Sequence, residues 1–133
     1  MRSRPALLIV DRNSRNVELL SAFLEDSGYR TAGVSALETF DAYLDQLKAG
    51  EPDLALVDLT GFDTSIWDRC KRLHEASVAF VVIARAQAAE HARDTHRQSG
   101  GSGARHLLTK PLRKEHLLTL VRILTGTDNQ PAP

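Results

Sequence analysis

The sequence has a single cysteine, Cys70, so it has no means of forming an internal disulfide. It also has no excess charge of either sign, because 17 Lys and Arg residues balance 17 Asp and Glu residues. A general electrostatic attraction to nucleic acid or to an anionic membrane is therefore excluded. The apolar runs are only a few residues long, whereas a transmembrane helix needs roughly 20. With no basic and apolar leader before Ala6, these absences predict a cytoplasmic protein without direct membrane or nucleic-acid contacts.

What the sequence contains fits one globular domain. Its 133 residues fall within the roughly 100 to 150 that are common for a single domain, and a hydrophobic share of 42% supplies a buried core. We predict a domain over residues 1–125 and a flexible C-terminal tail over residues 126–133, which ends in Gln-Pro-Ala-Pro.

Strand-like and helix-like segments alternate along the chain. The strand-like segments are short and mostly apolar, as in strands buried on both faces, and they cover 6–10, 29–34, 54–57, 78–83 and 106–109. Segments with helical spacing follow each of them, at 14–27, 35–50, 67–73, 87–98 and 114–124. This alternation predicts a doubly wound α/β fold, in which helices cover both faces of a five-stranded parallel sheet.

Local signals mark the helix ends. Ser35-Ala36-Leu37-Glu38 has the spacing of a capping box, and Gly50 is placed to end the helix that it opens. Ser14, Ser35 and Ser65 have no paired base nearby in the sequence, so we interpret them as helix caps rather than nucleophiles. No hydrolase is indicated, and we predict that the chain is not an enzyme.

Three charged residues come directly at the ends of predicted strands. Asp11 follows the first strand, Asp58 the third, and Lys110 the fifth, just before Pro111. In open parallel sheets, ligands bind outside the carboxyl ends of the strands. An Asp in this position is often only a turn or cap residue, but two acids and one amine at one edge predict a functional site.

These segments resemble the receiver domain of bacterial response regulators, from about Ala6 to Leu124. The resemblance rests on three stretches in the order and spacing of the family, namely Leu-Ile-Val-Asp ending at Asp11, Pro52–Leu59, and Leu108-Thr109-Lys110-Pro111. It implies a flavodoxin-like fold with strand order 2-1-3-4-5. It also implies that Asp58 is the phosphoacceptor, that Lys110 contacts the phosphoryl group, and that Asp11, Asp58 and the main-chain carbonyl of Thr60 hold magnesium.

Arg12 departs from the family, which normally has a second acid immediately after the first. An arginine is no ligand for magnesium. Its guanidinium either reaches Asp11 or Asp58 as a forked ion pair in the space of the metal, or turns out to solvent and leaves a weakened site completed by water. The sequence leaves both alternatives open.

Further departures concern the response to phosphorylation. Ile83 stands where the family has a small hydroxyl residue that binds the phosphoryl group, and Leu107 replaces the usual aromatic residue of the switch. The loop 60–65 lacks the usual proline and glycine turn. About five extra residues before the fifth strand are most simply accommodated by the glycine-rich stretch 100–103.

These changes all affect one mechanism, so we predict a pseudo-receiver. It would act as a regulatory module that binds signalling proteins, either a histidine kinase or a downstream effector, with impaired or absent magnesium-dependent phosphorylation. The alternative is a functional receiver that a histidine kinase phosphorylates at Asp58. Apolar residues of the last helix also suggest a homodimer through the fourth and fifth helices.

Two other classes of site are disfavoured by the sequence. A flavin-binding protein of the same architecture would need a phosphate-binding loop after the first strand, but residues 12–16 contain no glycine. His91 and His96 lie off a common helix face and have no third ligand nearby, so we predict no zinc site.

Overall fold

The computed structural model describes residues 4–48, 50–87 and 104–126. Its elements are β1 (Ala6–Val10), α1 (Ser14–Asp26), β2 (Arg30–Val34), α2 (Leu37–Asp45), β3 (Leu54–Asp58), α3 (Ile66–Glu75), β4 (Phe80–Arg85), β5 (Ala104–Lys110) and α5 (Lys114–Thr125). The five strands form one sheet in the order β2-β1-β3-β4-β5, and every neighbouring pair is parallel. The predicted fold class is confirmed.

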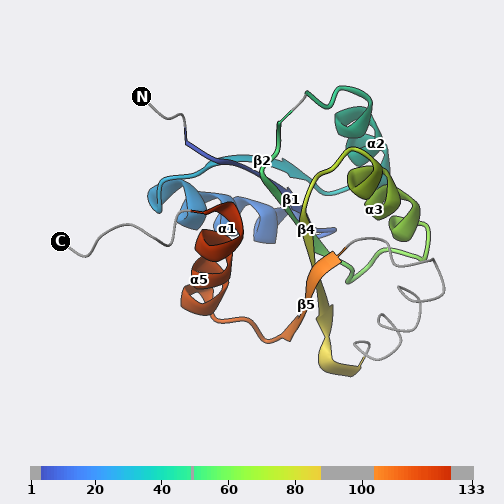
Figure 1. Cartoon of the computed structure of the whole chain (residues 1–133). Helices are drawn as coiled ribbons and strands as arrows, with labels where there is room; N and C mark the ends of the chain where they lie inside the picture. The colour runs from blue at the N-terminus through green and yellow to red at the C-terminus, as the bar shows by residue number, and fades with distance from the viewer. Residues whose placement is uncertain (1–3, 49, 88–103, 127–133) are drawn as a thin grey trace.

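Helices cover both faces of this sheet. Figure 1 shows α1 and α5 on one face and α2 and α3 on the other. Alternate residues of each strand point to opposite faces. Leu7 and Ile9 of β1 pack in the core between the sheet and the helices α1 and α5, which we call the α1–α5 core. Leu8 and Val10 pack in the core on the side of α2 and α3, which we call the α2–α3 core. Two cores explain why the central strands read as continuous apolar runs rather than as alternating ones.

The predicted capping box of α2 is wrong. The N-cap is Ala36, which makes no side-chain cap bond, and the Ser35 carbonyl accepts a hydrogen bond from Arg12 instead. The predicted end at Gly50 is also wrong, because the helix stops at Asp45. There the main-chain N–H groups of Gln46 and Leu47 bond to carbonyls three residues back, which tightens the last turn and ends it without a glycine.

The other two serine caps are not as predicted either. Asn13 caps α1, because its extended backbone lets the side chain accept hydrogen bonds from the N–H groups of Arg15 and Asn16. Ser14 is already inside the helix. Ser65 stands at the N-cap position of α3 but makes no side-chain cap bond, because its hydroxyl and its main-chain N–H both donate to the Asp63 carboxylate.

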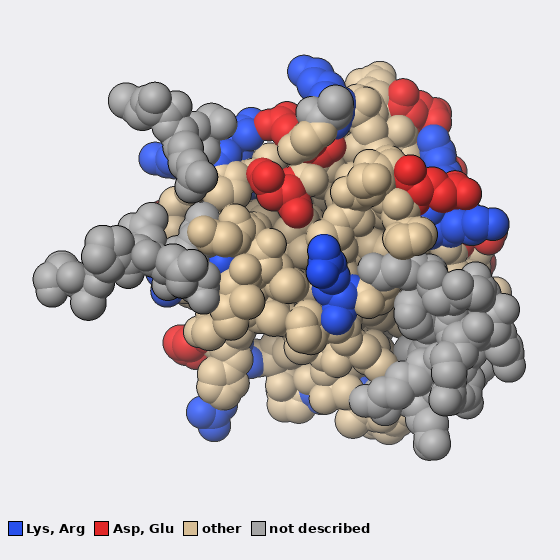
Figure 2. All heavy atoms as spheres, in the orientation of Figure 1, with Lys and Arg blue, Asp and Glu red and all other residues tan. Residues whose placement is uncertain are grey.

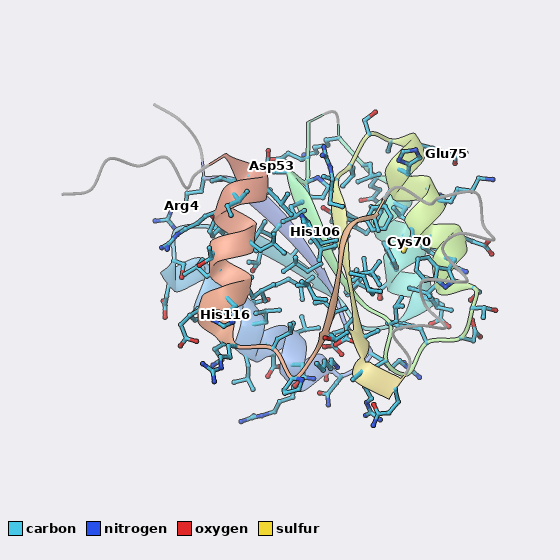
Figure 3. All side chains as sticks on the ribbon, turned by 60° about the horizontal axis from the view of Figure 1, so that its bottom comes forward. Arg4, Asp53, Cys70, Glu75, His106 and His116 are labelled. Atoms are coloured by element: carbon cyan, nitrogen blue, oxygen red, sulfur yellow. The ribbon has the colours of Figure 1, made fainter. Side chains whose placement is uncertain are left out.

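The α3 helix buries its large side chains against the sheet. Trp67 is only 8% exposed and packs in the α2–α3 core. Cys70 lies between α3 and the sheet (Figure 3), and burial raises the pKa of its thiol to about 12. The thiol is thus protonated and shielded, as expected of a cysteine that fills space rather than reacts.

Several expectations fall on residues outside the described ranges. They are most of the fourth helix at 87–98, the histidines 91 and 96, the glycine-rich stretch 100–103, and the tail beyond Gly126, which is the C-cap of α5.

Among the described residues, no helix is both long and apolar enough to cross a membrane. Acidic and basic side chains of the described residues are interspersed over the face shown in Figure 2.

Candidate functional site

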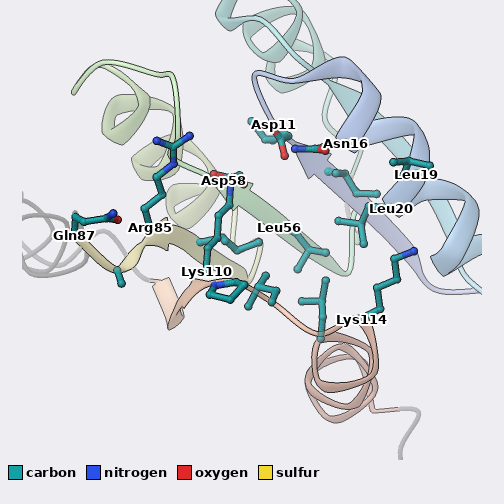
Figure 4. Close-up of a pocket in the computed structure, with 17 residues that line it drawn as sticks. Asp11, Asn16, Leu19, Leu20, Leu56, Asp58, Arg85, Gln87, Lys110 and Lys114 are labelled. Carbon is teal, nitrogen blue, oxygen red and sulfur yellow. Dashed lines mark ion pairs between the residues drawn. The ribbon is translucent and has the colours of Figure 1, made fainter.

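The alternation of side chains along the strands brings the three predicted site residues to one corner of the sheet. Asp11 continues the series of Leu7 and Ile9, so it lies on the α1–α5 side of the sheet, beyond the end of β1. Asp58 and Lys110 are the last residues of β3 and β5, on the same side. All three line one pocket (Figure 4).

Asp58 is buried and both of its carboxylate oxygens have partners. Lys110 Nζ lies 2.6 Å from Oδ2, and the main-chain N–H of Thr60 donates to Oδ1 over 2.9 Å. Lys110 reaches Asp58 across β4, since β5 is two strands away from β3. The ammonium also donates to the hydroxyl of Thr60 over 3.3 Å, a contact that sequence reasoning missed because it considered only the carbonyl of that residue.

Asp11 is the second buried carboxyl of the site, with 8% of its surface exposed. Its Oδ1 accepts a hydrogen bond from the main-chain N–H of Asn13 over 2.9 Å. Burial raises the pKa of Asp11, and the negative charge of Asp58 raises it further. The hydrogen bond from Asn13, the charge of Lys110 and the side chain of Asn16 only partly offset these effects on the pKa.

Arg12 lies outside this group of charges. Its Nη1 donates to the carbonyl oxygen of Ser35, after β2, over 3.3 Å. Its aliphatic stem passes Gly61, where an added methyl group would lie 3.0 Å from Cγ of Arg12. Within the described part of the chain, Arg12 forms no ion pair with Asp11 or Asp58, so the guanidinium joins two loops instead of occupying the space between the carboxylates.

Ile83 and Leu107 belong to different cores. Ile83 is 4% exposed, pairs with Asp58 in the parallel register, and packs in the α1–α5 core beside the pocket. Leu107 pairs with Val82 on β4 and packs against the α2–α3 core on the opposite face of the sheet. Neither side chain has a hydrogen-bonding group to offer to a ligand at Asp58.

The family model for the response regulator receiver domain matches residues 7–122, which is nearly all of the chain. The chain belongs to this family. The match covers all five strands and places Asp11, Asp58 and Lys110 inside the receiver domain. A search of the curated proteins found no match.

Solved receiver structures share the fold over nearly their whole length. A receiver protein from Pseudomonas putida is 27% identical, with a TM-score of 0.75 over 92% of this chain and 99% of that one. A CheY-like receiver from Methanospirillum hungatei JF-1 is 18% identical, with a TM-score of 0.77 over 93% and 95% of the two chains. The receiver domain of the sensor histidine kinase PA1611 from Pseudomonas aeruginosa PAO1 is 19% identical, with a TM-score of 0.72 over 92% and 98%. That structure has a magnesium ion in its active-site cleft.

The residues of this receiver domain are an incomplete fit to magnesium. Asp11, Asp58 and the Thr60 carbonyl are oxygen donors of the kind that the ion prefers. The position after Asp11, where the family normally has a second acid, is occupied by Arg12, whose side chain is a cation directed to Ser35. Among the described residues, no group of three or more His, Cys, Asp or Glu side chains is arranged to hold a metal.

The pocket extends well beyond the three charged residues. Its volume is about 530 Å³, and it continues between α1 and α5 along apolar side chains. These apolar residues are Ile9, Val10, Leu19, Leu20, Leu56, Ile83, Leu112 and Leu117. Sequence reasoning missed this extension, although the alternation of residues along β1, β3 and β4 gives part of it.

Proposed function

We propose that this receiver domain is a pseudo-receiver, a regulatory module that binds signalling proteins and in which magnesium-dependent phosphorylation of Asp58 is impaired or absent. The observation that carries the proposal is the lack of a second carboxylate beside Asp11. The residue that follows this first acid is Arg12, whose cationic side chain is bonded to the Ser35 carbonyl and supplies no oxygen ligand for magnesium. Partners of such a module are a histidine kinase or a downstream effector, in the cytoplasm, and it has no catalytic role of its own.

The apolar side chain at residue 83 supports the same proposal. A phosphoryl group on Asp58 would face Ile83, because the two residues are paired in neighbouring strands. An isoleucine donates no hydrogen bond, so a charged phosphoryl oxygen on that side would stay without a partner in a buried place. The cost of this unpaired charge weakens both the modification and its readout.

A second candidate function is favoured by the pair of Asp58 and Lys110. Their contact of 2.6 Å places an ammonium beside the carboxylate, where it would offset the charge of an added phosphoryl group. The alternative is therefore a receiver that is still phosphorylated at Asp58 by a histidine kinase, with magnesium held weakly by Asp11, Asp58 and the carbonyl of Thr60.

Amide NMR of the purified chain with magnesium and beryllofluoride, a phosphoryl mimic, separates the two functions. We compare the unmodified protein with Asp58→Asn, Arg12→Asp and the matched control Arg12→Asn. The control removes the cation without adding a carboxylate. We expect no saturable shifts in the unmodified protein or in Arg12→Asn. Arg12→Asp should show saturable shifts around Asp58, because its affinity should be at least about 10- to 100-fold higher than that of the other variants, the range that loss of a metal partner typically costs.

Saturable shifts around Asp58 in the unmodified protein that disappear in Asp58→Asn would overturn the pseudo-receiver. Equal gains in Arg12→Asp and Arg12→Asn would show that the positive charge of Arg12, rather than the missing ligand, weakens the site.

A homodimer through the fourth and fifth helices stays a prediction. On α5, Ile123 is 52% exposed and available for such a contact.

A further inference from the structure

The pocket beside Asp58 has the dimensions and lining of a small-molecule site. Its volume of about 530 Å³ lies within the range of roughly 300 to 1,000 Å³ that is typical of ligand pockets. Such pockets are mostly apolar and contain a few polar groups that fix the orientation of the ligand. In this receiver domain the apolar part is formed between α1 and α5, and the polar groups stand at its ends (Figure 4).

The apolar part combines buried and accessible side chains. Leu56 on β3 and Leu117 on α5 are buried at its base, whereas Leu19 on α1 is 49% exposed at its edge. Ile83 continues this surface up to Asp58. An apolar group that enters the pocket would therefore contact several aliphatic side chains and shield Leu19 from water, which is favourable.

The charges of the lining favour an anion. The pocket is lined by the cations Arg85, Lys110 and Lys114 and by the anions Asp11 and Asp58, so one positive charge is in excess. Lys110 is paired with Asp58, and Arg85 lies near that end of the pocket as well (Figure 4). At the other end, Lys114 stands beside Leu19 and Leu20 without an acidic residue in the lining.

Lys114 is held in a defined place. Its Nζ lies 5.7 Å from the centre of the Phe23 ring, which draws the side chain from α5 towards α1. Within the described part of the chain, no carboxylate forms an ion pair with this ammonium. It can therefore bind a ligand anion without first breaking an ion pair.

We propose that this pocket binds a small amphipathic anion, with its acidic group at Lys114 and its apolar body between α1 and α5, against Leu20 and Ile83. The proposal goes beyond the function proposed above and does not depend on it. A ligand in this place would border Asp58, so its binding would change the surroundings of the candidate phosphoacceptor. It would give this domain a chemical input of its own, separate from the phosphorylation of Asp58.

The test is a fluorescence titration of the whole chain with anilinonaphthalene sulfonate, which has an apolar body and one negative charge. Phenylnaphthylamine, the same ring system without the sulfonate, serves as the neutral probe. No magnesium and no phosphoryl donor are present, so the result is independent of the phosphorylation of Asp58. We expect saturable binding of the anionic probe at one site, and weaker binding of the neutral probe.

Two pairs of variants locate the site. Leu19→Glu adds a negative charge at the edge of the pocket and should weaken binding of the anionic probe at least about tenfold, because a like charge opposes it. Ile123→Glu is the matched control, since Ile123 is similarly exposed on α5 but does not line the pocket. Lys114→Gln should weaken binding of the anionic probe roughly two- to fivefold, as expected for an accessible ion pair, while Lys71→Gln on α3 leaves it unchanged.

The thermal midpoint of each variant shows that it is folded before it is titrated. The proposal is overturned if the unmodified protein shows no saturable binding, or if the neutral probe binds as tightly as the anionic one. Equal effects of Leu19→Glu and Ile123→Glu would also overturn it, because the probe would then bind elsewhere. Equal effects of Lys114→Gln and Lys71→Gln would show that the acidic group of the ligand does not bind at Lys114.

Discussion

At the scale of single residues, the site contains two buried carboxyl groups with different surroundings. Asp58 has a cation 2.6 Å away, whereas the nearest partner that Asp11 has is a main-chain N–H group. Burial therefore raises the pKa of Asp11, and Asp58 adds to the effect. An ionised carboxyl group in this buried position therefore makes the folded protein less stable than a neutral group in the same position would.

Asp11→Asn should therefore stabilise the domain at neutral pH. The folded-state pKa of Asp11 is above its value of 3.8 in the unfolded chain, so its contribution to stability is present at low pH and is lost as the pH rises through the folded-state pKa. Asparagine carries no charge, and its oxygen can still accept the hydrogen bond from Asn13. We expect the free energy of unfolding at pH 7 to increase by up to about 2 kcal/mol, a normal size for one substitution.

Urea denaturation at several pH values checks this expectation. The gain should shrink as the pH falls through the folded-state pKa of Asp11, and it should be absent well below 3.8, where the carboxyl group is protonated in both states. Asp26→Asn, on the exposed side of α1, is the control and should change stability by no more than about 0.5 kcal/mol. A gain from Asp11→Asn that grows as the pH falls would mean that the pKa of Asp11 is lowered in the folded protein.

At the scale of elements, the strands were predictable and several helix ends were not. A strand buried between two layers must be apolar throughout, and this requirement shows in the sequence of β1, β3 and β4. Whether a residue can cap a helix depends on the φ and ψ angles of that one residue. Asn13 and Ala36 have the extended backbone of an N-cap, whereas Ser14 is already in the helix and Ser35 precedes the cap, and nothing in the sequence separates these neighbours.

The same difference explains which parts of the site were predictable. Asp11, Asp58 and Lys110 meet because they end parallel strands, so their convergence follows from the fold. The direction of Arg12 depends on a carbonyl after β2 and on the space beside Gly61 after β3. Contacts between loops that are far apart in the sequence leave no periodic signal, so two alternatives for Arg12 stayed open.

The packing of α1 on β2 gives a prediction at this scale. A methyl group added to Gly33 on β2 would lie 2.3 Å from Cγ1 of Val17 on α1, much closer than two carbon atoms allow. Valine is stiff in a helix, so it cannot turn away without cost. We expect Gly33→Ala to lower the free energy of unfolding by about 1 to 3 kcal/mol, as is usual for overpacking.

A double-mutant cycle with Val17→Ala tests the cause of this loss. The smaller side chain makes room for the methyl group, so Gly33→Ala should cost clearly less in the Val17→Ala background than in the unmodified protein. Guanidinium denaturation of the four proteins measures the difference. Additive effects of the two substitutions would show that the methyl group added at residue 33 does not collide with Val17.

At the scale of the whole molecule, Ile83 and Leu107, the two apolar residues at the predicted switch positions, lie on opposite faces of the sheet. Ile83 is next to Asp58 and packs in the α1–α5 core, whereas Leu107, on the next strand, packs in the α2–α3 core. Lys110 touches Asp58 directly at the end of β5, but a change at Asp58 must pass β4 to reach Leu107 further back on β5. The side chain of Ile83 can donate no hydrogen bond to an added phosphoryl group. In the pseudo-receiver that we propose, binding at Asp58 and its transmission are therefore two separate defects.

Separate defects should be repairable one at a time. In Arg12→Asp, we expect magnesium and beryllofluoride to shift amide signals only around Asp11, Asp58 and Lys110. Adding Ile83→Thr supplies the missing hydroxyl group on the side of the sheet that faces Asp58, so the shifts should extend along β4 and reach Leu107 on β5. The buried hydroxyl group is expected to lower the free energy of unfolding by about 1 to 3 kcal/mol, so thermal midpoints are measured as well.

Val82→Thr in the same Arg12→Asp background is the matched control. Val82 is the neighbour of Ile83 on β4 and is also buried, but it packs in the α2–α3 core, away from Asp58. Its hydroxyl group would therefore point to the wrong face and leave the shifts confined to the site. If both threonines extend the shifts alike, the effect comes from loosening β4 rather than from a bond to the phosphoryl group. If Arg12→Asp alone shifts the amide signal of Leu107 on β5, transmission in this domain does not need a hydroxyl group at residue 83.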